Sequence, residues 1–376
     1  KNNNNKILNT CYLNKDEIIT GNIERIKDIN IIPSPYLTGA LDNFFKDPLI
    51  PLLETTRGCP FACTFCADGL ATKNGVYRYD ADRTKDELIY IAKRVKNIDE
   101  LIVTDLNFAM YKQDIITAKM IAQSQKTYNF PTLVSASYGK NMPKRTIEVA
   151  GILKGSSFGA AIQSTDPEVL KNIRRSNIST KAYQDLIEFG NTDPDSRNKT
   201  EAAIILGLPG DTKQKHYETI KFAVDNNVTF VRMFQLMLLP GTEMASQKDR
   251  KKFGFKTKFR VIPGALGNYN ILDKKRSIAE IEEIVVGNNT LSYEDYIDCR
   301  VMNLLVTTFY NTSIFEEIFA MLRAMNISRH ECLVYLKNHN ELYSKKINEI
   351  IKLFIKGTTH DLYDSWEEAN KVVLSP

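Results

Sequence analysis

Residues 57–66 read Arg-Gly-Cys-Pro-Phe-Ala-Cys-Thr-Phe-Cys, and this run is the strongest indication of the fold and the chemistry of the chain. It places three thiols, Cys59, Cys63 and Cys66, at the spacing C-x3-C-x2-C. Thiolates are the usual ligands of [4Fe–4S] clusters, which normally take four of them. The other cysteines are far away in the sequence, at positions 11, 299 and 332. Three ligands would hold three irons and leave the fourth iron open to another molecule.

Three structural roles compete with the cluster. A zinc site with short spacing needs a fourth Cys or His, and the first histidine, His216, follows only about 150 residues later. Disulfides suit small secreted domains, whereas this chain has 376 residues. Simple burial of three thiols is the third alternative. The spacing favours the iron–sulfur cluster over all three.

The run resembles the signature of the radical S-adenosylmethionine (SAM) superfamily, C-x3-C-x-aromatic-C, in which Phe65 is the aromatic residue. In that family the open iron binds the amino and carboxylate groups of SAM, and an electron from the reduced cluster cleaves SAM to a 5′-deoxyadenosyl radical. The resemblance therefore implies a [4Fe–4S] cluster on Cys59, Cys63 and Cys66, with SAM as a second cofactor. It also places Phe65 near the adenine of SAM.

From about residue 50 to residue 240, short β-rich runs alternate with amphipathic helical runs. The expected strands are Ile50–Thr56, Glu100–Thr104, Thr132–Ser137, Ser157–Gln163, Ala202–Gly207 and Phe230–Leu236. The expected helices are Asp82–Lys96, Gln113–Gln125, Arg145–Lys154, Lys181–Phe189 and Lys213–Asn226. Six strand–helix units predict an α/β fold, a partial (β/α)6 barrel of the TIM type. The functional groups should lie at the carboxyl ends of its strands, where the cysteine run already is.

The resemblance assigns SAM contacts to residues that follow the later strands. Asp105 would meet the amino group, although an Asp at a strand end equally often caps the next helix. Ser137 would bind the ribose or the carboxylate. Arg175 would bind the carboxylate, because a guanidinium fork matches a carboxylate bidentately, and it fits the family register better than Arg174. The alternative for Arg175 is a surface arginine on a polar helix turn.

Four further contacts follow from the same resemblance. Gln163 and Ser164 stand where the family has its ribose-binding strand, and the amide of Gln163 keeps hydrogen-bonding capacity without charge. Gly207 would let the backbone approach the adenine closely. Gln235, on the last strand, would face the barrel and contact substrate or cofactor. No acid, base or radical relay is singled out, so the catalytic residues stay unknown.

We expect three segments: an N-terminal linker, 1–48, a radical SAM core, 49–262, and a helical C-terminal region, 263–376. The linker resembles the connection from a cobalamin-binding domain in the cobalamin-dependent branch of the superfamily, which implies that the chain is the C-terminal part of something longer. Beyond Pro263, three Ser-x-x-Glu patterns read as capping boxes, at residues 277–280, 313–316 and 328–331. They predict helices that cover the open side of the barrel or the substrate.

The leading prediction is a transferase that cleaves SAM for the cobalamin-dependent methylation or rearrangement of a small molecule. The alternatives are a cobalamin-independent radical SAM enzyme and a non-catalytic, metal-stabilised binding module. An electron donor such as flavodoxin or ferredoxin would be a partner. The net charge of +5 is mild for this length and argues against nucleic-acid binding. The sequence contains no apolar run of about 18 residues, so we expect no membrane span and a cytoplasmic, reducing location.

Overall fold

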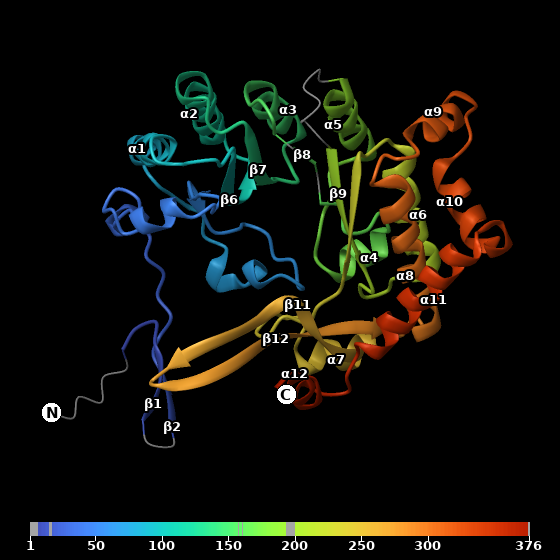
Figure 1. Cartoon of the computed structure of the whole chain (residues 1–376). Coiled ribbons are helices and arrows are strands. Elements are labelled where there is room, and N and C mark those ends of the chain that lie inside the picture. Colours follow the sequence, from blue (N-terminus) through green and yellow to red (C-terminus); the bar gives the residue numbers. More distant parts are fainter. Residues whose placement is uncertain (1–6, 15–16, 157, 160, 193–199, 375–376) are drawn as a thin grey trace.

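The computed structural model of the chain describes all residues except 1–6, 15–16, 157, 160, 193–199 and 375–376 (Figure 1). Its centre is a half barrel of six parallel strands in sequence order. They are β3 (Leu52–Leu53), β6 (Glu100–Phe108), β7 (Leu133–Tyr138), β8 (Phe158–Gly159), β9 (Thr200–Leu206) and β10 (Phe230–Gln235). A parallel bridge between Val134 and Ser156 joins β7 to the start of β8. The predicted partial barrel is confirmed; Ser157 and Ala160, within the fourth predicted strand, lie outside the described residues.

Six helices follow the strands of this sheet, and all but the short fourth one cover its outer face (Figure 1). They are α1 (Ala81–Ala92), α2 (Lys112–Tyr128), α3 (Pro143–Ile152), α4 (Pro167–Asn172), α5 (Thr180–Thr192) and α6 (Lys213–Asp225). Prolines stand in the first turn of α3 and α4, where a missing backbone N–H costs nothing. The side chain of Thr212 caps α6 by accepting from the backbone N–H of Lys215. Local signals of this kind explain why the five expected helices are all found close to their predicted bounds.

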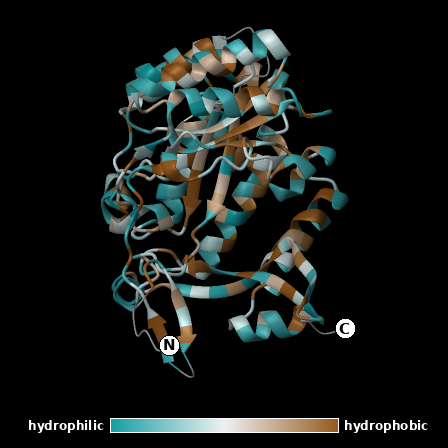
Figure 2. Ribbon diagram, turned by 90° about the vertical axis from the view of Figure 1, so that its left-hand side faces the viewer, coloured by the Kyte–Doolittle hydropathy of each residue, from teal (hydrophilic) through white to brown (hydrophobic). Residues whose placement is uncertain are grey.

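The hydrophobic core divides along the sheet. One cluster packs β3, β6 and β7 against α1 to α3, and Leu53, Leu101 and Ile121 are fully buried in it. A second cluster packs β9 and β10 against α5 and α6 and continues into the C-terminal helices. The central strands are mostly apolar in Figure 2, as expected for parallel strands that helices cover. The second half of the barrel and the C-terminal helices therefore share one apolar cluster, separate from that of the first half.

Two short hairpins flank the barrel. The first, β1 (Cys11–Asn14) with β2 (Glu17–Thr20), lies near the N-terminus. The second, β4 (Thr56–Arg57) with β5 (Tyr77–Arg78), brackets the cysteine run. Between them the chain is tied to β3 by Tyr36, whose hydroxyl donates to the Leu52 carbonyl (2.8 Å) and accepts from the Leu52 amide (3.1 Å).

A long antiparallel hairpin, β11 (Lys256–Ile271) with β12 (Lys274–Gly287), begins the C-terminal region after α7 (Gln247–Phe253). It crosses the carboxyl ends of the barrel strands (Figure 1). It attaches there because the Leu238 amide donates to the Glu283 carbonyl and the Val285 amide to the Leu236 carbonyl, both at 2.9 Å. The prediction that helices alone follow Pro263 is therefore wrong for residues up to 287.

Helices make up most of the chain after the hairpin. They are α8 (Tyr293–Leu305), a π-helical turn (Val306–Tyr310), α9 (Glu316–Ala324), α10 (Arg329–Asn338), α11 (Lys345–His360) and α12 (Trp366–Leu374). Of the three predicted capping boxes, only Ser328 is an N-cap, accepting from the Glu331 amide at 3.1 Å. Ser277 lies inside β12, and α9 starts without a side-chain cap from Ser313. Those two predictions are wrong.

Candidate functional site

The cysteine run leaves the barrel at the carboxyl end of β3 and returns through β5. Two glycines shape it. Gly58 has a φ of 108°, and a Cβ there would lie 2.1 Å from the Gly75 carbonyl oxygen. A Cβ on Gly69 would lie 2.2 Å from the carbonyl oxygen of Cys63. The loop is therefore folded so closely around Cys63 that neither position tolerates a side chain without rearrangement.

Asp105 anchors the start of this loop instead of facing the cavity. It is 2% exposed, and its carboxylate accepts from the backbone N–H groups of Thr55 (2.7 Å) and Thr56 (2.9 Å) and from the Thr55 hydroxyl. Burial raises the pKa of Asp105, and these hydrogen bonds oppose the rise. The position of Asp105 thus gives no support to its predicted contact with the SAM amino group.

Two side chains that the sequence did not single out donate to the cysteine sulfurs. Asn107 Nδ2 lies 3.3 Å from the sulfur of Cys59, and Lys140 Nζ lies 3.4 Å from the sulfur of Cys63. Lys140 is 6% exposed and stands 4.0 Å above the ring of Phe61. Its pKa is lowered by burial and by the charge of Arg175, while Cys63 opposes the fall. Asn107 is the penultimate residue of β6 and Lys140 lies two residues after β7, and this position at the carboxyl end of a strand is the signal that could have found them.

Arg175 joins Lys140 beside the thiols. Its Nε donates to Asn177 Oδ1 (2.9 Å) and its Nη2 to the Ala161 carbonyl, which fixes the guanidinium at the cavity wall. Burial lowers its pKa, and the nearby Cys63 opposes that shift. Arg174 turns outward and forms a bidentate pair with Glu243 at 2.7 and 2.6 Å. The structure therefore brings Arg175, rather than Arg174, to the site.

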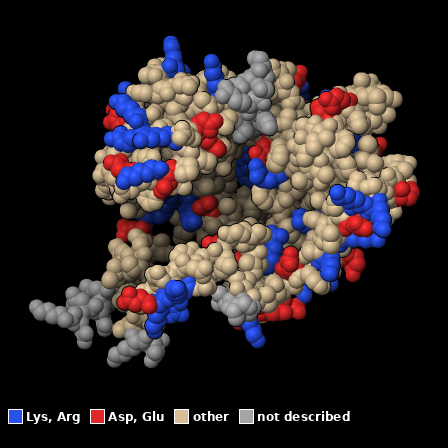
Figure 3. Space-filling view, in the orientation of Figure 1, with Lys and Arg blue, Asp and Glu red and all other residues tan. Residues whose placement is uncertain are grey.

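The cavity inside the half barrel has a volume of about 360 Å³. Figure 3 shows the molecule hollowed at its centre, with basic atoms on the wall of the hollow. Ser137, Lys140 and Arg175 line one part of the cavity. Elsewhere its wall includes Phe234 and the ion pair of Arg232 with Glu201. The cavity thus has a polar part beside the thiols, and a second part with an apolar wall and charged groups. A cofactor could occupy the first part and a substrate the second.

Three other predicted contacts lie outside this cavity. Phe65 packs against the apolar cluster beneath the loop that follows β9. Gln163 is 9% exposed, and its Oε1 has no hydrogen-bond partner within the described chain. Ser164 is 3% exposed and its hydroxyl accepts from the Asp166 amide at 3.1 Å. Their predicted roles at SAM stay predictions that the cavity lining does not support.

The C-terminal region covers the last two predicted contacts. Gly207, with a φ of 89°, is buried, and its carbonyl accepts from Asn288 Nδ2 at 3.3 Å. The side-chain Oε1 of Gln235 accepts from the hydroxyl of Tyr296 on α8. Gln235 therefore points away from the cavity, whereas its neighbour Phe234 lines it. This follows from the two-residue period of a strand, in which adjacent side chains face opposite sides.

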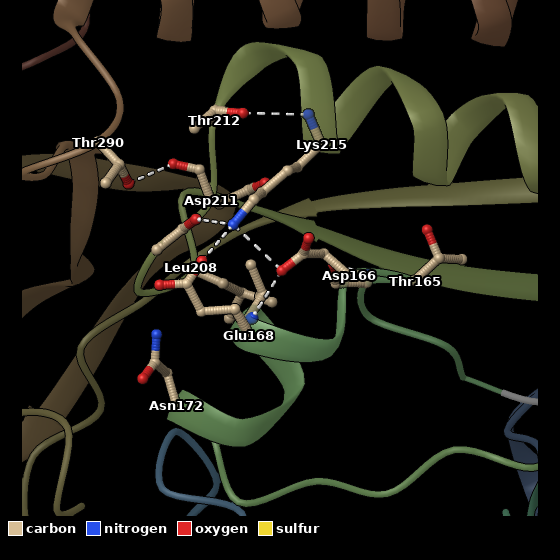
Figure 4. Close-up of polar contacts among 12 residues, drawn as sticks. Thr165, Asp166, Glu168, Asn172, Leu208, Asp211, Thr212, Lys215 and Thr290 are labelled. Carbon is tan, nitrogen blue, oxygen red and sulfur yellow. Dashed lines mark hydrogen bonds and ion pairs between the residues drawn. The ribbon is translucent and has the colours of Figure 1, made fainter.

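A polar network holds the turn that follows β9 (Figure 4). Lys215 of α6 lies 2.7 Å from Glu168, 3.2 Å from Asp166 and 3.0 Å from the Gly210 carbonyl oxygen. The hydroxyl of Thr290, from the C-terminal region, donates to the Asp211 carbonyl at 2.5 Å. Helices α4 and α6 and the end of the hairpin therefore all hold the same turn.

Asp211 and His216 are buried together under this turn. The carboxylate of Asp211 is 3.9 Å from His216 Nδ1, and the other ring nitrogen of His216 is 3.3 Å from Asn303 Oδ1. Burial raises the pKa of Asp211 to about 7 and lowers that of His216 to about 4. Near pH 7 His216 is therefore neutral and Asp211 is about half protonated, because burial disfavours the charged form of each.

The donor set fits a cluster with a net negative charge. Three thiols share one loop, two N–H donors reach their sulfurs, and two cations stand beside them. Within the described ranges no group of three or more His, Cys, Asp or Glu side chains is arranged to hold a single metal ion. A cubane cluster needs its ligands farther apart than a single metal ion does, because each cysteine sulfur binds a separate iron. The site thus suits [4Fe–4S] better than mononuclear zinc.

Comparison with known proteins agrees with the cysteine run. Residues 53–223 match the family model of the radical SAM superfamily. The chain therefore carries a radical SAM domain. Its curated relatives include a 2-(S-pantetheinyl)-carbapenam-3-carboxylate methyltransferase of Streptantibioticus cattleyicolor, 27% identical over 284 residues, 71% of this chain and 39% of the relative. They also include the cobalamin-dependent radical SAM methyltransferase TokK of Streptomyces tokunonensis, 26% identical over 64% of this chain and 36% of the relative.

A solved structure matches along nearly the whole chain. The cobalamin-dependent SAM radical enzyme OxsB, with aqua-cobalamin and SAM bound, aligns with 99% of this chain and 64% of its own, at a TM-score of 0.54 and 10% identity. At that identity the likeness concerns the fold. The chain spans well under half the length of the two curated relatives named above. Among the described helices, none is long and apolar enough to cross a membrane.

Proposed function

We propose that this chain is the catalytic core of a cobalamin-dependent radical SAM methyltransferase that acts on a small molecule. The observation that carries the proposal is that Lys140 and Arg175, which line the half-barrel cavity, both lie beside the thiol of Cys63. A [4Fe–4S] cluster held by Cys59, Cys63 and Cys66 would supply the electron that cleaves bound SAM. The protein's own task is then to hold SAM and substrate and to exclude competing reactions.

Arg175 and Ser137 are the SAM contacts that the cavity supports. Both line it, and the guanidinium of Arg175 is held at the wall by Asn177 and the Ala161 carbonyl. A guanidinium fixed in this way can meet a carboxylate with little loss of side-chain entropy. Lys140 and Asn107 donate to the cysteine sulfurs, and we propose that they stabilise the thiolate form of these ligands.

The cobalamin and methyl-transfer parts of the proposal rest on the two curated relatives, both named as methyltransferases and one of them, TokK, as cobalamin-dependent. The cavity, with an apolar wall at Phe234 and a charged pair at Arg232 and Glu201, suits a small molecule with both apolar and polar parts. The proposal also includes a flavodoxin or ferredoxin as electron donor, a reducing cytoplasm, and segment boundaries at 1–48, 49–262 and 263–376.

The test is anaerobic reconstitution of the full chain with iron and sulfide, followed by dithionite, SAM and an assay for 5′-deoxyadenosine. We expect about four irons and four sulfides per chain, the content of one [4Fe–4S] cluster. Cys63→Ala should abolish deoxyadenosine. Added methylcobalamin, with methylated product as the readout, separates the cobalamin-dependent reading from the cobalamin-independent one.

The matched control is Cys332→Ala, because Cys332 is a partly buried thiol on α10, far from the loop. It should load iron and cleave SAM like the parent. If Cys63→Ala loads and cleaves SAM as well as Cys332→Ala does, the cluster assignment is wrong. If the parent loads a full cluster but neither binds nor cleaves SAM, the metal-stabilised binding module becomes the better reading.

A further inference from the structure

A second cavity lies at the amino end of the half barrel, opposite the cysteine loop. Its volume is about 440 Å³. It lies where the chain before β10 meets the π-helical turn, α9 and the start of α10, in the upper right of Figure 1. Its wall is largely polar and includes Asn227, Ser313, Glu316, Arg323 and Arg329. The proposed SAM chemistry does not use this cavity, so a role for the cavity is independent of that chemistry.

Arg329 is the unusual member of this wall. It is 2% exposed, yet within the described chain its guanidinium makes no hydrogen bond and has no carboxylate within ion-pair distance. Only its backbone N–H is used, donating to Asp225 Oδ1 at 3.0 Å. The ring of Tyr310 is 5.9 Å away, which gives a weak cation–π contact at most.

Within the described chain the carboxylates near Arg329 form no ion pair with its guanidinium. Arg323 lines the same cavity and pairs with Glu316 at 2.8 Å, so one carboxylate faces two guanidinium groups. Burial lowers the pKa of Arg329 and the charge of Arg323 acts in the same direction, while Tyr310 and the carboxylates of Asp225 and Glu316 oppose the fall. The hydroxyl of Tyr310 donates to the Val228 carbonyl at 2.6 Å, and within the described chain no hydrogen bond joins it to the guanidinium of Arg329. Among the described residues that line the cavity, Arg323, Arg329 and Glu316 leave a net charge of about +1, and the guanidinium of Arg329 keeps a fork of N–H donors without an acceptor.

An isolated buried charge is costly, and proteins normally pair it or bind an ion to it. We propose that this cavity binds a small oxyanion, held by the guanidinium of Arg329 and assisted by Arg323. Ser313 and Asn227 offer hydroxyl and amide groups at the same wall. Because the cavity joins the barrel to α9 and α10, the bound anion would hold the C-terminal helices on the amino end of the barrel.

Inorganic phosphate is the first probe, added to the purified full chain while thermal unfolding is followed by circular dichroism. We expect a saturable rise in Tm of about 3 °C or more, because a ligand that binds only the folded state stabilises it. Potassium chloride at equal ionic strength should not reproduce the rise. Acetate in place of phosphate tells whether the site takes tetrahedral oxyanions or carboxylates as well.

Arg329→Met supplies the decisive variant. Without added anion its Tm should equal or exceed that of the parent, because Met replaces an unpaired buried charge with apolar volume. Its response to phosphate should be lost, whereas Arg329→Lys should keep part of it. Phosphate also stabilises proteins generally by exclusion from their surface, so each response is compared with that of Arg300→Met. Arg300 is a partly buried arginine over the ring of Phe354, outside this cavity.

Two results would overturn the proposal. One is a phosphate response in Arg329→Met that matches the response of the parent and of Arg300→Met. The other is a parent whose Tm changes no more in phosphate than in chloride. Isothermal titration of the parent with phosphate adds a direct measurement, and a stoichiometry near one that is absent in Arg329→Met supports the site.

Discussion

At the carboxyl end of the half barrel Lys140 and Arg175 lie beside the thiol of Cys63, whereas at the amino end Arg329 is buried with no acceptor within the described chain. Both ends place cations in a cavity wall. At the carboxyl end the chain supplies the partner itself, in thiols that become anionic when they bind iron. At the amino end the partner must come from outside. Buried cations therefore indicate a ligand most clearly where the described chain forms no ion pair or hydrogen bond with them.

The substitution Asp105→Ala would create unpaired buried polar groups at the carboxyl end of the barrel, comparable to the unpaired Arg329 at the amino end. It removes the acceptor of the Thr55 and Thr56 amides and leaves two buried N–H groups unsatisfied. We expect a loss of about 3–5 kcal/mol in the free energy of unfolding, measured with urea. Asp105→Asn, which keeps one acceptor oxygen, should lose about half as much. A loss below about 1 kcal/mol for Asp105→Ala would show that the loop start is held by other contacts.

Asp211 and His216 add a third case to this comparison of buried charged groups. Burial shifts the pKa of each toward its neutral form, so that neither depends on a fully charged partner. The pKa of Asp211 rises from 3.8 to about 7 in the folded state, so its contribution to stability falls as pH rises through that window. The pKa of His216 falls from 6.5 to about 4, so its contribution grows as pH rises from 4 to 6.5. The two slopes oppose each other where the windows overlap.

Asp211→Asn should therefore expose the slope of His216 alone. Between pH 4 and 6.5 the variant should gain up to about 1.4 kcal/mol of stability per pH unit relative to the parent. His216→Gln should show the opposite trend and lose stability as pH rises. Urea unfolding at four pH values measures both slopes. Parallel pH curves for the parent and both variants would mean that these groups titrate alike in the folded and unfolded chain.

Lys140→Met tests the pairing at the carboxyl end directly. It removes a cation and an N–H donor from the sulfur of Cys63, and both favour the reduced cluster, which carries more negative charge. At a fixed potential we expect about a tenfold lower ratio of reduced to oxidised cluster, equivalent to a shift of about 59 mV to more negative potential. An EPR-monitored redox titration measures it.

The control for that titration is Lys144→Met, which removes an exposed lysine on α3. Its potential should match that of the parent. Asn107→Leu, which removes a neutral donor from the sulfur of Cys59, should shift the potential in the same direction as Lys140→Met but by less. Equal potentials for Lys140→Met and Lys144→Met would show that Lys140 does not act on the cluster.

The smallest effect should come from a pair that lies on the surface. Arg174 and Glu243 form a bidentate contact, but their side chains are 58% and 43% exposed. Arg174→Met should cost no more than about 0.5 kcal/mol, and less in 1 M salt. Urea unfolding at low and high salt checks it. A larger cost would mean that the pair also orders the neighbouring Arg175.

Much of the fold could be predicted because its signals are local. Apolar periodicity and helix caps lie within single elements, so helices such as α2 and α6 were found close to their predicted bounds. The hairpin β11–β12 was missed because its turn carries no such signal. Leu272 and Asp273 have φ values of 50° and 61°, a conformation that Asn-Gly usually marks. The contact of β12 with the chain after β10 is long-range and leaves no local pattern.

The candidate site shows the same limit. The cysteines and Arg175 were found because a motif fixes their register, while Asn107 and Lys140 were recognised only once the strand ends met in space. Gln235 was assigned to the wrong face, because a prediction that is one residue off reverses the side of a strand. Gly207 was expected to be open to adenine, but the hairpin covers it, and the hairpin had not been predicted.

The contact between Asn288 and the turn after β9 also sets an order of events during synthesis. Asn288 Nδ2 donates to the carbonyls of Gly207 and Leu208, which lie about 80 residues earlier in the chain, at 3.3 and 3.1 Å. The six strands can pair as they emerge, since each neighbour in the sheet is the next in sequence. The turn receives its last support only when the hairpin is complete. The mouth of the barrel should thus mature late, after nearly four-fifths of these residues have left the ribosome.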